Sequence, residues 1–140
     1  MRGEKSLYKV MHDDGVGNVN ISDFENRTQV SLDEIEAQMG APPWAVRVAY
    51  NELFGGVLIA QEPGGGNRMH YHPDADEFWL IIKGVWEWFI EGEGTRRVRK
   101  NDFVLARKNK KHRMKVVGKT IGIRLAITRP DVEHIFVKRG

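Results

Sequence analysis

Three side chains near the middle of the sequence have the types and the spacing of a transition-metal site. His70 and His72 stand two residues apart, so in an extended strand both imidazoles project from the same face. Residues 73–76, with the sequence PDAD, are typical of a turn, and Glu77 then opens an apolar run typical of a strand. Two imidazoles and one carboxylate can therefore meet across a hairpin, and this donor set suits transition metals. The alternative is that both histidines are structural residues that bind no ligand.

Glycines flank this histidine and glutamate pattern at fixed intervals. Five residues separate Gly64 from His70, four separate His72 from Glu77, and six separate Glu77 from Gly84. The whole pattern resembles the first motif of the cupin superfamily position by position, including both glycines. In that family the two histidines and the glutamate bind a metal ion. The resemblance therefore implies that His70, His72 and Glu77 are metal ligands.

A second cupin motif usually carries one more histidine ligand, and residues 101–112 correspond to it. Asn101, Arg107 and Asn109 stand where the family usually has glycine, proline and glycine. Asparagine tolerates a positive φ better than other non-glycine residues, so a tight turn can survive these changes. The histidine itself is in register. The resemblance therefore implies that His112 is the fourth ligand.

Arg68 is the residue that we expect to orient a substrate. It lies two residues before His70, which places it on the same face if the strand extends that far. A guanidinium there can hold a substrate carboxylate through two parallel hydrogen bonds. The remaining histidines, His12 and His134, lie outside both motifs, and we expect them to be surface or edge residues outside the site.

Three imidazoles and one carboxylate leave two positions of an octahedral ion for water, substrate or dioxygen. The donor set suits Fe(II), Mn(II), Ni(II), Cu(II) or Zn(II), and it does not suit a closed all-oxygen site for Ca or Mg. Cupins with such a site are oxygenases, in which substrate and dioxygen meet on iron, or they use the metal as a Lewis acid, as isomerases, epimerases and lyases do. A third possibility is a non-catalytic module that binds a small ligand.

One cupin family is similar in more than the ligands. Arg68, followed by His72, Glu77 and His112, resembles the pattern of the 3-hydroxyanthranilate 3,4-dioxygenases, which are iron cupins. In that family a second arginine follows the late histidine by four residues, where this chain has Val116. The partial resemblance favours Fe(II) as the cofactor and a non-haem dioxygenase acting on a small carboxylated or phenolic substrate.

Basic residues suggest that the substrate is anionic. Ten arginine and lysine residues lie between Arg96 and Lys115, and they form a solvated basic face, a nucleic-acid surface or an attractive field for small anions. No helix-turn-helix, zinc finger or similar motif accompanies them, so we expect no nucleic-acid partner. Arg47 and Arg124 lie inside apolar strands and need a partner, which is either an acidic side chain or an anionic ligand.

Large apolar side chains alternate along the two strands that follow the first motif. Trp79 and Ile81 share one strand face, and Trp86, Trp88 and Ile90 share one face of the next strand. If these faces point inward, they wall a pocket around the metal. The alternatives are that they fill the core or form a dimer face.

From Trp44 onward, short strands follow one another at regular spacing with glycine-rich turns. This pattern indicates an all-β sandwich or barrel. The cupin resemblance selects the double-stranded β-helix, or jelly-roll, barrel and implies a homodimer. We therefore predict an N-terminal arm over residues 1–43, which is part of the same domain, and a cupin β-barrel over residues 44–140.

The arm is expected to contain one short helix. The sequence SLDE at residues 31–34 is a capping box, and the helix should end near Met39 with Gly40 as its C-terminal stop. The polar stretch before it shows little periodicity. We expect short strands there, at residues 7–11 and 19–21.

Composition limits the possibilities further. The chain has 140 residues, of which 41% are hydrophobic and 29% are charged, and this is typical of one globular domain with its own core. Cysteine is absent, which excludes disulfides, a thiolate nucleophile and sulfur ligands. The N-terminus lacks the apolar core of a secretory signal, and no apolar run is long enough to span a membrane, so we expect a cytoplasmic protein without a membrane partner.

Overall fold

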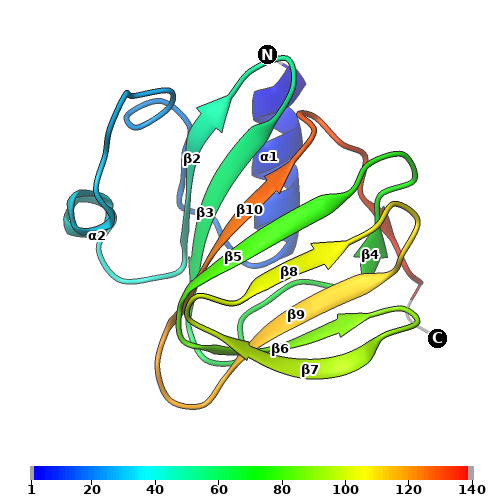
Figure 1. Cartoon of the computed structure of the whole chain (residues 1–140). Helices are drawn as coiled ribbons and strands as arrows, with labels where there is room; N and C mark the ends of the chain where they lie inside the picture. The colour runs from blue at the N-terminus through cyan, green and yellow to red at the C-terminus, as the bar shows by residue number, and fades with distance from the viewer. Residues whose placement is uncertain (1, 139–140) are drawn as a thin grey trace.

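Two β-sheets face each other in the computed structural model, which describes residues 2–138 (Figure 1). No helix in this range is long and apolar enough to cross a membrane. The helices are α1 (Arg2–Asp13) and α2 (Leu32–Met39). The strands are β1 (Val19–Asn20), β2 (Trp44–Tyr50), β3 (Gly55–Gln61), β4 (His70–Tyr71), β5 (Glu77–Lys83), β6 (Val85–Ile90), β7 (Gly94–Arg99), β8 (Phe103–Ala106), β9 (His112–Val117), β10 (Gly122–Thr128) and β11 (Ile135–Phe136).

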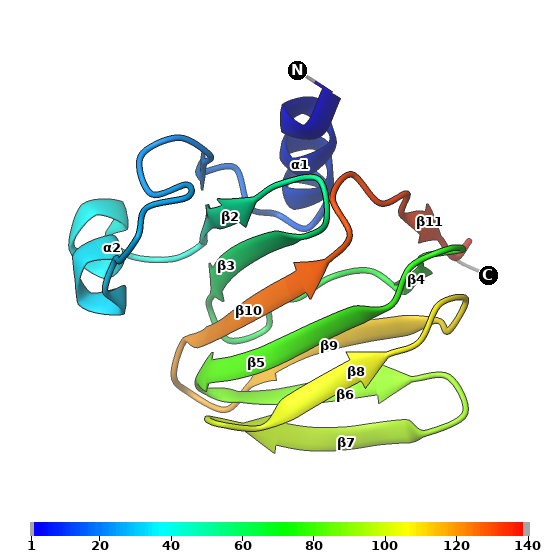
Figure 2. The ribbon, with the colours of Figure 1, turned by 45° about the horizontal axis from the view of Figure 1, so that its top comes forward.

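The strand order confirms the predicted double-stranded β-helix. One sheet has the order β1-β2-β3-β10-β5-β8, and the other has the order β11-β4-β9-β6-β7 (Figure 2). From β5 to β10 the chain passes repeatedly from one sheet to the other, with β6 and β7 as the only consecutive strands in the same sheet, and this is the jelly-roll arrangement. All pairs are antiparallel except β1 with β2. Asn101 and Asn109 adopt φ values of 75° and 68° in the turns where cupins usually have glycine, as predicted.

The space between the sheets is filled by the alternating apolar residues. Trp79, Trp86 and Trp88 are all buried, and the rings of Trp79 and Trp88 meet edge to face with centroids 5.0 Å apart. The opposite faces of β7 and β9 carry exposed charged side chains, because neighbouring residues of a strand point to opposite sides. The tryptophans therefore belong to the barrel interior and not to a dimer face.

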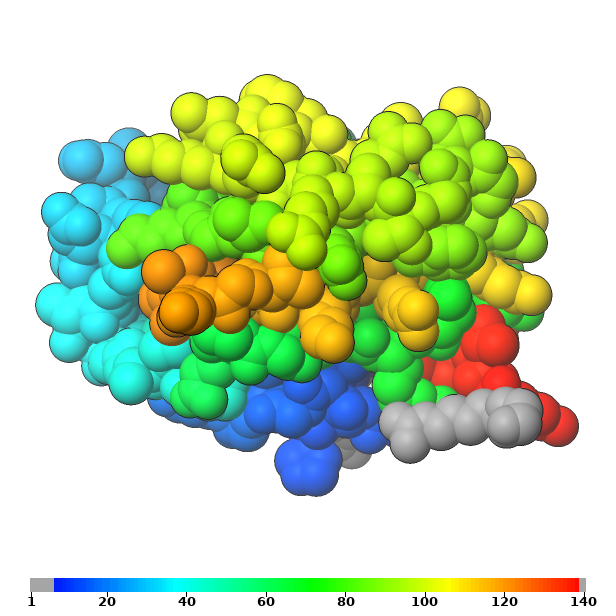
Figure 3. Space-filling view, turned by 90° about the horizontal axis from the view of Figure 1, so that it is seen from below, coloured from blue at the N-terminus to red at the C-terminus, as the bar shows by residue number. Residues whose placement is uncertain are grey.

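Helix α1 replaces a predicted strand. We expected a short strand at residues 7–11, and this prediction is wrong, since Arg2–Asp13 is helical. Leu7, Val10 and Met11 have the i, i+3, i+4 spacing of one helix face, and this face packs on the barrel core. In Figure 3, α1 (blue) and the C-terminal segment (red) lie on the side of the molecule away from β7 and β8.

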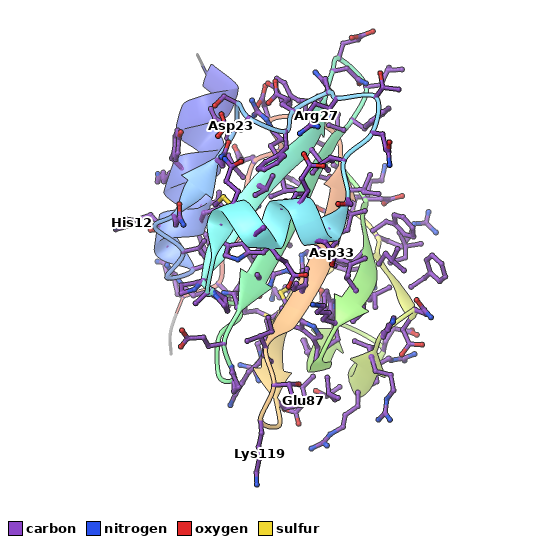
Figure 4. The ribbon with its side chains drawn as sticks, turned by 90° about the vertical axis from the view of Figure 1, so that its left-hand side faces the viewer. His12, Asp23, Arg27, Asp33, Glu87 and Lys119 are labelled. Carbon is purple, nitrogen blue, oxygen red and sulfur yellow. The ribbon has the colours of Figure 1, made fainter. Side chains whose placement is uncertain are left out.

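Helix α2 forms as the capping box predicts. The Ser31 hydroxyl accepts a hydrogen bond from the Glu34 N–H (3.0 Å), and Gly40, with φ of 76°, follows the last helical residue. The helix crosses the outer face of the sheet that contains β2, β3 and β10 (Figure 4). A second apolar core lies there, in which Ile35 of α2 joins Trp44 and other buried residues. One sheet is therefore covered on both faces.

The junction between α1 and the barrel contains a buried polar cluster that makes stability depend on pH. Burial raises the pKa of Asp14 to about 7, although the charge of Arg124 opposes this rise. The Gln61 side chain accepts a hydrogen bond from Arg124 (2.5 Å) and donates to the Asp14 carbonyl (3.4 Å). Between pH 4 and 7 the folded state thus holds a proton on Asp14 that the unfolded chain releases.

We expect the contribution of Asp14 to the free energy of unfolding to fall as pH rises from about 4 to about 7, because ionising Asp14 costs more in the folded state. Asp14→Asn should remove this contribution, so the wild type should lose stability relative to the variant over this range and be no more stable than the variant at pH 7.5. Urea unfolding at several pH values measures both. An unchanged profile in the variant would contradict the assignment.

Candidate metal centre

The structure brings the four residues predicted as ligands together at one end of the barrel. His70 lies on β4, His72 follows that strand, and Glu77 and His112 are the first residues of β5 and β9. One nitrogen or oxygen atom from each of the four lies within 4.8 Å of the others, and the group could hold a metal ion. Because β4 and β9 belong to one sheet and β5 to the other, the group lies between the sheets.

Strand register explains this convergence. His70 and His112 are direct partners in the pairing of β4 with β9, so their side chains leave the sheet on the same side. Glu77 shares the inward face of β5 with Trp79, because residues two apart in a strand face the same way. Trp79 also packs against the His112 ring, with centroids 5.1 Å apart. Trp79 thus forms part of the wall around the site, and this was the first of the interpretations given for the aromatic pattern.

A backbone carbonyl orients each of the three imidazoles. A carbonyl oxygen only accepts hydrogen bonds, so the ring nitrogen that faces it, Nδ1, must carry the hydrogen. The other nitrogen, Nε2, then presents its lone pair to the site, which is the tautomer that a metal ligand needs. The hydrogen bonds run from His70 to Arg68 (2.9 Å), from His72 to Glu133 (2.9 Å) and from His112 to Lys110 (3.0 Å).

The polar atoms of the site fit a cation. The Nε2 atom of His72 lies 2.7 Å from Oε1 of Glu77, and Nε2 of His112 lies 3.5 Å from the same oxygen. The second nitrogen is buried without a hydrogen-bond partner among the described residues. Lone pairs that face a buried carboxylate repel one another unless a positive charge lies between them. A proton or a metal ion can supply that charge, and four N and O donors suit a transition metal.

Burial and neighbouring charges shift the pKa values of three of these four groups. Burial alone would raise the pKa of Glu77, but the imidazoles of His112 and His72 hold it well below its usual range. Burial, together with the charge of His112, lowers the pKa of His70 to about 3. Burial also acts to lower the pKa of His72, but the hydrogen bond and the charge of Glu77 outweigh it and raise that pKa. At neutral pH the site thus contains a carboxylate and at least one neutral imidazole.

A pocket opens beside Glu77, and we call it the α1 pocket because helix α1 forms one wall. Its volume is about 100 Å³. Most of its wall is apolar. The residues that line it include Leu7, Val10, Met11, Val57, Ile59, Ala126 and Val132, together with Glu77 and His134.

His134 is a residue of this site that the sequence did not reveal. We expected an edge residue outside the site, but its ring centroid lies 4.5 Å from that of His72 and 5.1 Å from that of His70. The strand β11 is indeed an edge strand, and its pairing with β4 carries the preceding residue to the ligands. This pairing joins segments more than sixty residues apart, so local sequence patterns do not predict it. By contrast, His12 is exposed on α1, as expected (Figure 4).

Arg68 lies outside the α1 pocket. Strand β4 begins only at His70, so Arg68 precedes the strand. Its guanidinium stacks over the Phe136 ring, 4.4 Å from the centroid, and it borders a groove on the outer side together with Arg113. The Arg68 carbonyl, not its side chain, contacts a residue of the site, since it accepts the hydrogen bond from His70. A role for Arg68 in orienting substrate stays a prediction.

The other arginines of the apolar strands have partners within the protein. Arg47 forms an ion pair with Glu25 at 2.5 Å. Arg124 donates a hydrogen bond to Gln61 at 2.5 Å, and its guanidinium lies 5.0 Å from the Trp86 ring centroid. These partners favour the structural interpretation of both arginines. The basic residues between Arg96 and Lys115 are exposed on the outer faces of β7 and β9 and in the turn before β9.

Comparisons with known proteins agree with this fold. The family described as "Cupin domain" matches residues 57–128. An uncharacterized conserved protein with a double-stranded beta-helix domain from Klebsiella pneumoniae has a TM-score of 0.68 and 18% sequence identity, over 81% of this chain and 94% of that chain. No curated protein matches the chain in sequence.

Two enzymes are among the similar structures. A sugar phosphate isomerase of Silicibacter pomeroyi has a TM-score of 0.55 and 20% identity, over 62% of this chain and 58% of that chain. The oxalate decarboxylase of Bacillus subtilis, which has Mn(II) centres, has a TM-score of 0.56 and 19% identity, over 61% of this chain and 24% of that chain. This chain therefore spans about a quarter of the decarboxylase. At such identities the likeness establishes the fold alone.

Removing one ligand should remove metal binding while the barrel stays folded, because the apolar core does not include the site. We expect Glu77→Gln and His112→Ala to bind Mn(II) or Zn(II) at least about 100-fold more weakly than the wild type, since even indirect contacts to ligands contribute ~10–100-fold. Metal analysis after dialysis and circular dichroism measure the two properties. His12→Ala is the control and should bind as the wild type does. Wild-type affinity in Glu77→Gln would place the metal elsewhere.

Proposed function

This chain belongs to the cupin family, whose pattern covers residues 57–128, and on that premise we propose that it is a mononuclear metal enzyme acting on a small organic substrate. The proposed ligands are His70, His72, Glu77 and His112. The proposed cofactor is one divalent transition metal ion, with Fe(II) as the first candidate. Mn(II) is the second, because the oxalate decarboxylase of similar fold has Mn(II) centres.

One observation carries this proposal. The Nε2 atoms of His72 and His112 face the same oxygen of Glu77, and no protein donor accompanies the buried Nε2 of His112 among residues 2–138. Such an arrangement is unfavourable without a cation, and a purely structural cluster would be expected to contain its own donors. The α1 pocket adjoins the same glutamate, so a small molecule can reach the site.

The metal and the residues around the site would have separate roles. A bound metal supplies Lewis acidity and open coordination positions for a substrate group. The carbonyls of Arg68, Glu133 and Lys110 keep the three imidazoles in place, and such contacts strengthen ligation. Trp79 and Trp88 close the barrel behind the ligands and exclude water from that side. In this low-dielectric setting the charge of Glu77 acts strongly on any polar group nearby.

Two reaction classes fit this site. Dioxygen chemistry on a carboxylated or phenolic substrate follows from the partial resemblance to an iron dioxygenase family. Non-oxidative chemistry, such as isomerisation, epimerisation or lyase-type cleavage, is the second candidate, and the isomerase and decarboxylase of similar fold favour it. Val116, which stands where the dioxygenases have a second arginine, is buried in the core and offers no charge to a substrate.

Reaction class can be tested with a panel of small carboxylic acids, phenols, aminophenols and sugar phosphates. If the enzyme is a dioxygenase, the Fe(II)-loaded protein should consume oxygen and one substrate in equal amounts, and turnover should stop under argon. Oxygen uptake and product formation measure both. Full turnover under argon would contradict the dioxygenase proposal and support the non-oxidative one.

The matched control is Glu77→Gln, which should be inactive on every substrate because it fails to hold the metal. A protein that binds metal and a ligand but turns over nothing in the panel, with or without oxygen, would contradict both reaction classes. Ligand-dependent thermal shifts would then support a binding module.

A further inference from the structure

The walls of the α1 pocket are apolar over most of their area. Leu7, Val10 and Met11 of α1 form one wall, while Val57 and Ala126 of two neighbouring strands face it. None of these side chains can donate a hydrogen bond, and the only acceptor among them is the weak one on the Met11 sulfur. A charged group held against them would lose its hydration without compensation, so the pocket favours an apolar occupant.

Charged residues at the rim of the α1 pocket are already occupied by partners. Arg47 pairs with Glu25 at 2.5 Å, and its guanidinium also stacks on the Tyr50 ring, 3.8 Å from the centroid. Arg129 pairs with Asp74 at 2.7 Å. Each arginine that lines the pocket thus has its charge balanced within the protein, and neither is left to bind a substrate anion.

The acidic residue at the rim of the α1 pocket, Asp131, also has a partner within the protein. Asp131 accepts a hydrogen bond from the Tyr50 hydroxyl at 2.8 Å. The hydroxyl of Thr128, which also lines the pocket, donates to the carbonyl of Asp76 at 2.9 Å. The other polar residues of the lining are Glu77, which belongs to the metal centre, and His134, which packs against it. Polar recognition of a ligand is therefore concentrated where the pocket meets the metal centre.

His134 is arranged as a hydrogen-bond acceptor. Its Nδ1 donates to the carbonyl of Val132 at 3.2 Å, so its Nε2 carries a lone pair. The ring lies against His72 and His70, yet its nitrogen is not among the four mutually close ligand atoms. His134 is thus placed beside the centre and not within the predicted ligand set. A molecule bound at the centre can donate a hydrogen bond to this nitrogen.

We propose that the α1 pocket binds the body of the substrate, that this body is a short, uncharged apolar group, and that His134 accepts a hydrogen bond from the polar head. This inference rests on the proposed function, since the head is the part that binds the metal. A cavity of ~150 Å³ accommodates a benzene ring. The α1 pocket, with about 100 Å³, therefore suits a chain of about three or four carbon atoms.

The substrate class follows from this division. Any negative charge is confined to the head, where the metal balances it, and the rest of the molecule is aliphatic. Among the substrates proposed above, this favours an aliphatic molecule with one charged or chelating group over a phenolic one. A dianion, such as a dicarboxylate or a sugar phosphate, would find both arginines of this pocket already paired with acidic side chains.

Three hydroxamic acids that share one metal-binding group test the pocket. Zn(II)-loaded protein is titrated by calorimetry with acetohydroxamic acid, butanehydroxamic acid and succinic monohydroxamic acid. We expect butanehydroxamic acid to bind about tenfold more tightly than acetohydroxamic acid, because it buries two more methylene groups. It should also bind at least tenfold more tightly than the charged succinic probe. Equal affinities, or tighter binding of the charged probe, would overturn the proposal.

Two variants separate the pocket from the metal site. Val57→Thr has nearly the same shape but adds a hydroxyl to the wall, so it should reduce the preference for the longer apolar probe severalfold. His134→Phe keeps a ring but removes the acceptor, so it should weaken all three probes by ~2–10-fold, with Zn(II) content unchanged. His12→Phe is its control. Unchanged probe affinities in both variants, or loss of Zn(II) from His134→Phe, would overturn the assignment.

Zinc content is measured before any probe is added, and this distinguishes the two levels of failure. A wild-type protein that binds no stoichiometric Zn(II) contradicts the proposed function itself. A protein that binds Zn(II) fully but does not discriminate among the probes contradicts only the assignment of the α1 pocket.

Discussion

The confinement of one carboxylate among three imidazoles, within a few ångströms and away from water, is the constraint on which the rest of the structure depends. Each of His70, His72 and His112 gives its Nδ1 hydrogen to a backbone carbonyl, so each presents its Nε2 inward. One oxygen of Glu77 faces the Nε2 atoms of His72 and His112. Without a proton or a metal ion between them, the nitrogen lone pairs and the carboxylate repel one another. A cation relieves this conflict, and the donor types make a transition metal the fitting one.

The barrel supplies what this arrangement requires. Pairing of β4 with β9 sets two imidazoles side by side, and β5 brings the glutamate from the opposite sheet. The tryptophans behind them keep the interior dry, while α1 and the segment before β11 close the other side and leave one small pocket. The four residues of the candidate centre thus come from the barrel motifs, while α1 and the segment before β11 add walls to the pocket beside it.

Local spacing, together with the resemblance to the two cupin motifs, predicted the four residues of the candidate centre and most of the strands. The HxH pair, the turn that follows and the strand that begins at Glu77 are encoded within a few residues, and the alternation of Trp79, Trp86 and Trp88 defines the inward faces. What local patterns could not predict depends on long-range packing. Helix α1 is stabilised by packing on the barrel, and its polar sequence alone does not predict this contact. His134 reaches the site through the pairing of β11 with β4. The Arg68 side chain packs against Phe136. Its predicted direction assumed that the strand already includes Arg68, but β4 begins two residues later, at His70.

The most direct test of this account is a crystal structure of the protein with anomalous diffraction recorded above and below the absorption edge of the bound metal. We expect one anomalous peak per chain, within bonding distance of the Nε2 atoms of His70, His72 and His112 and of a carboxylate oxygen of Glu77. Ligand distances should be ~2.0–2.2 Å. A fully folded protein with no peak among these four residues after exposure to Mn(II), Fe(II) and Zn(II), or with a peak elsewhere, would contradict it.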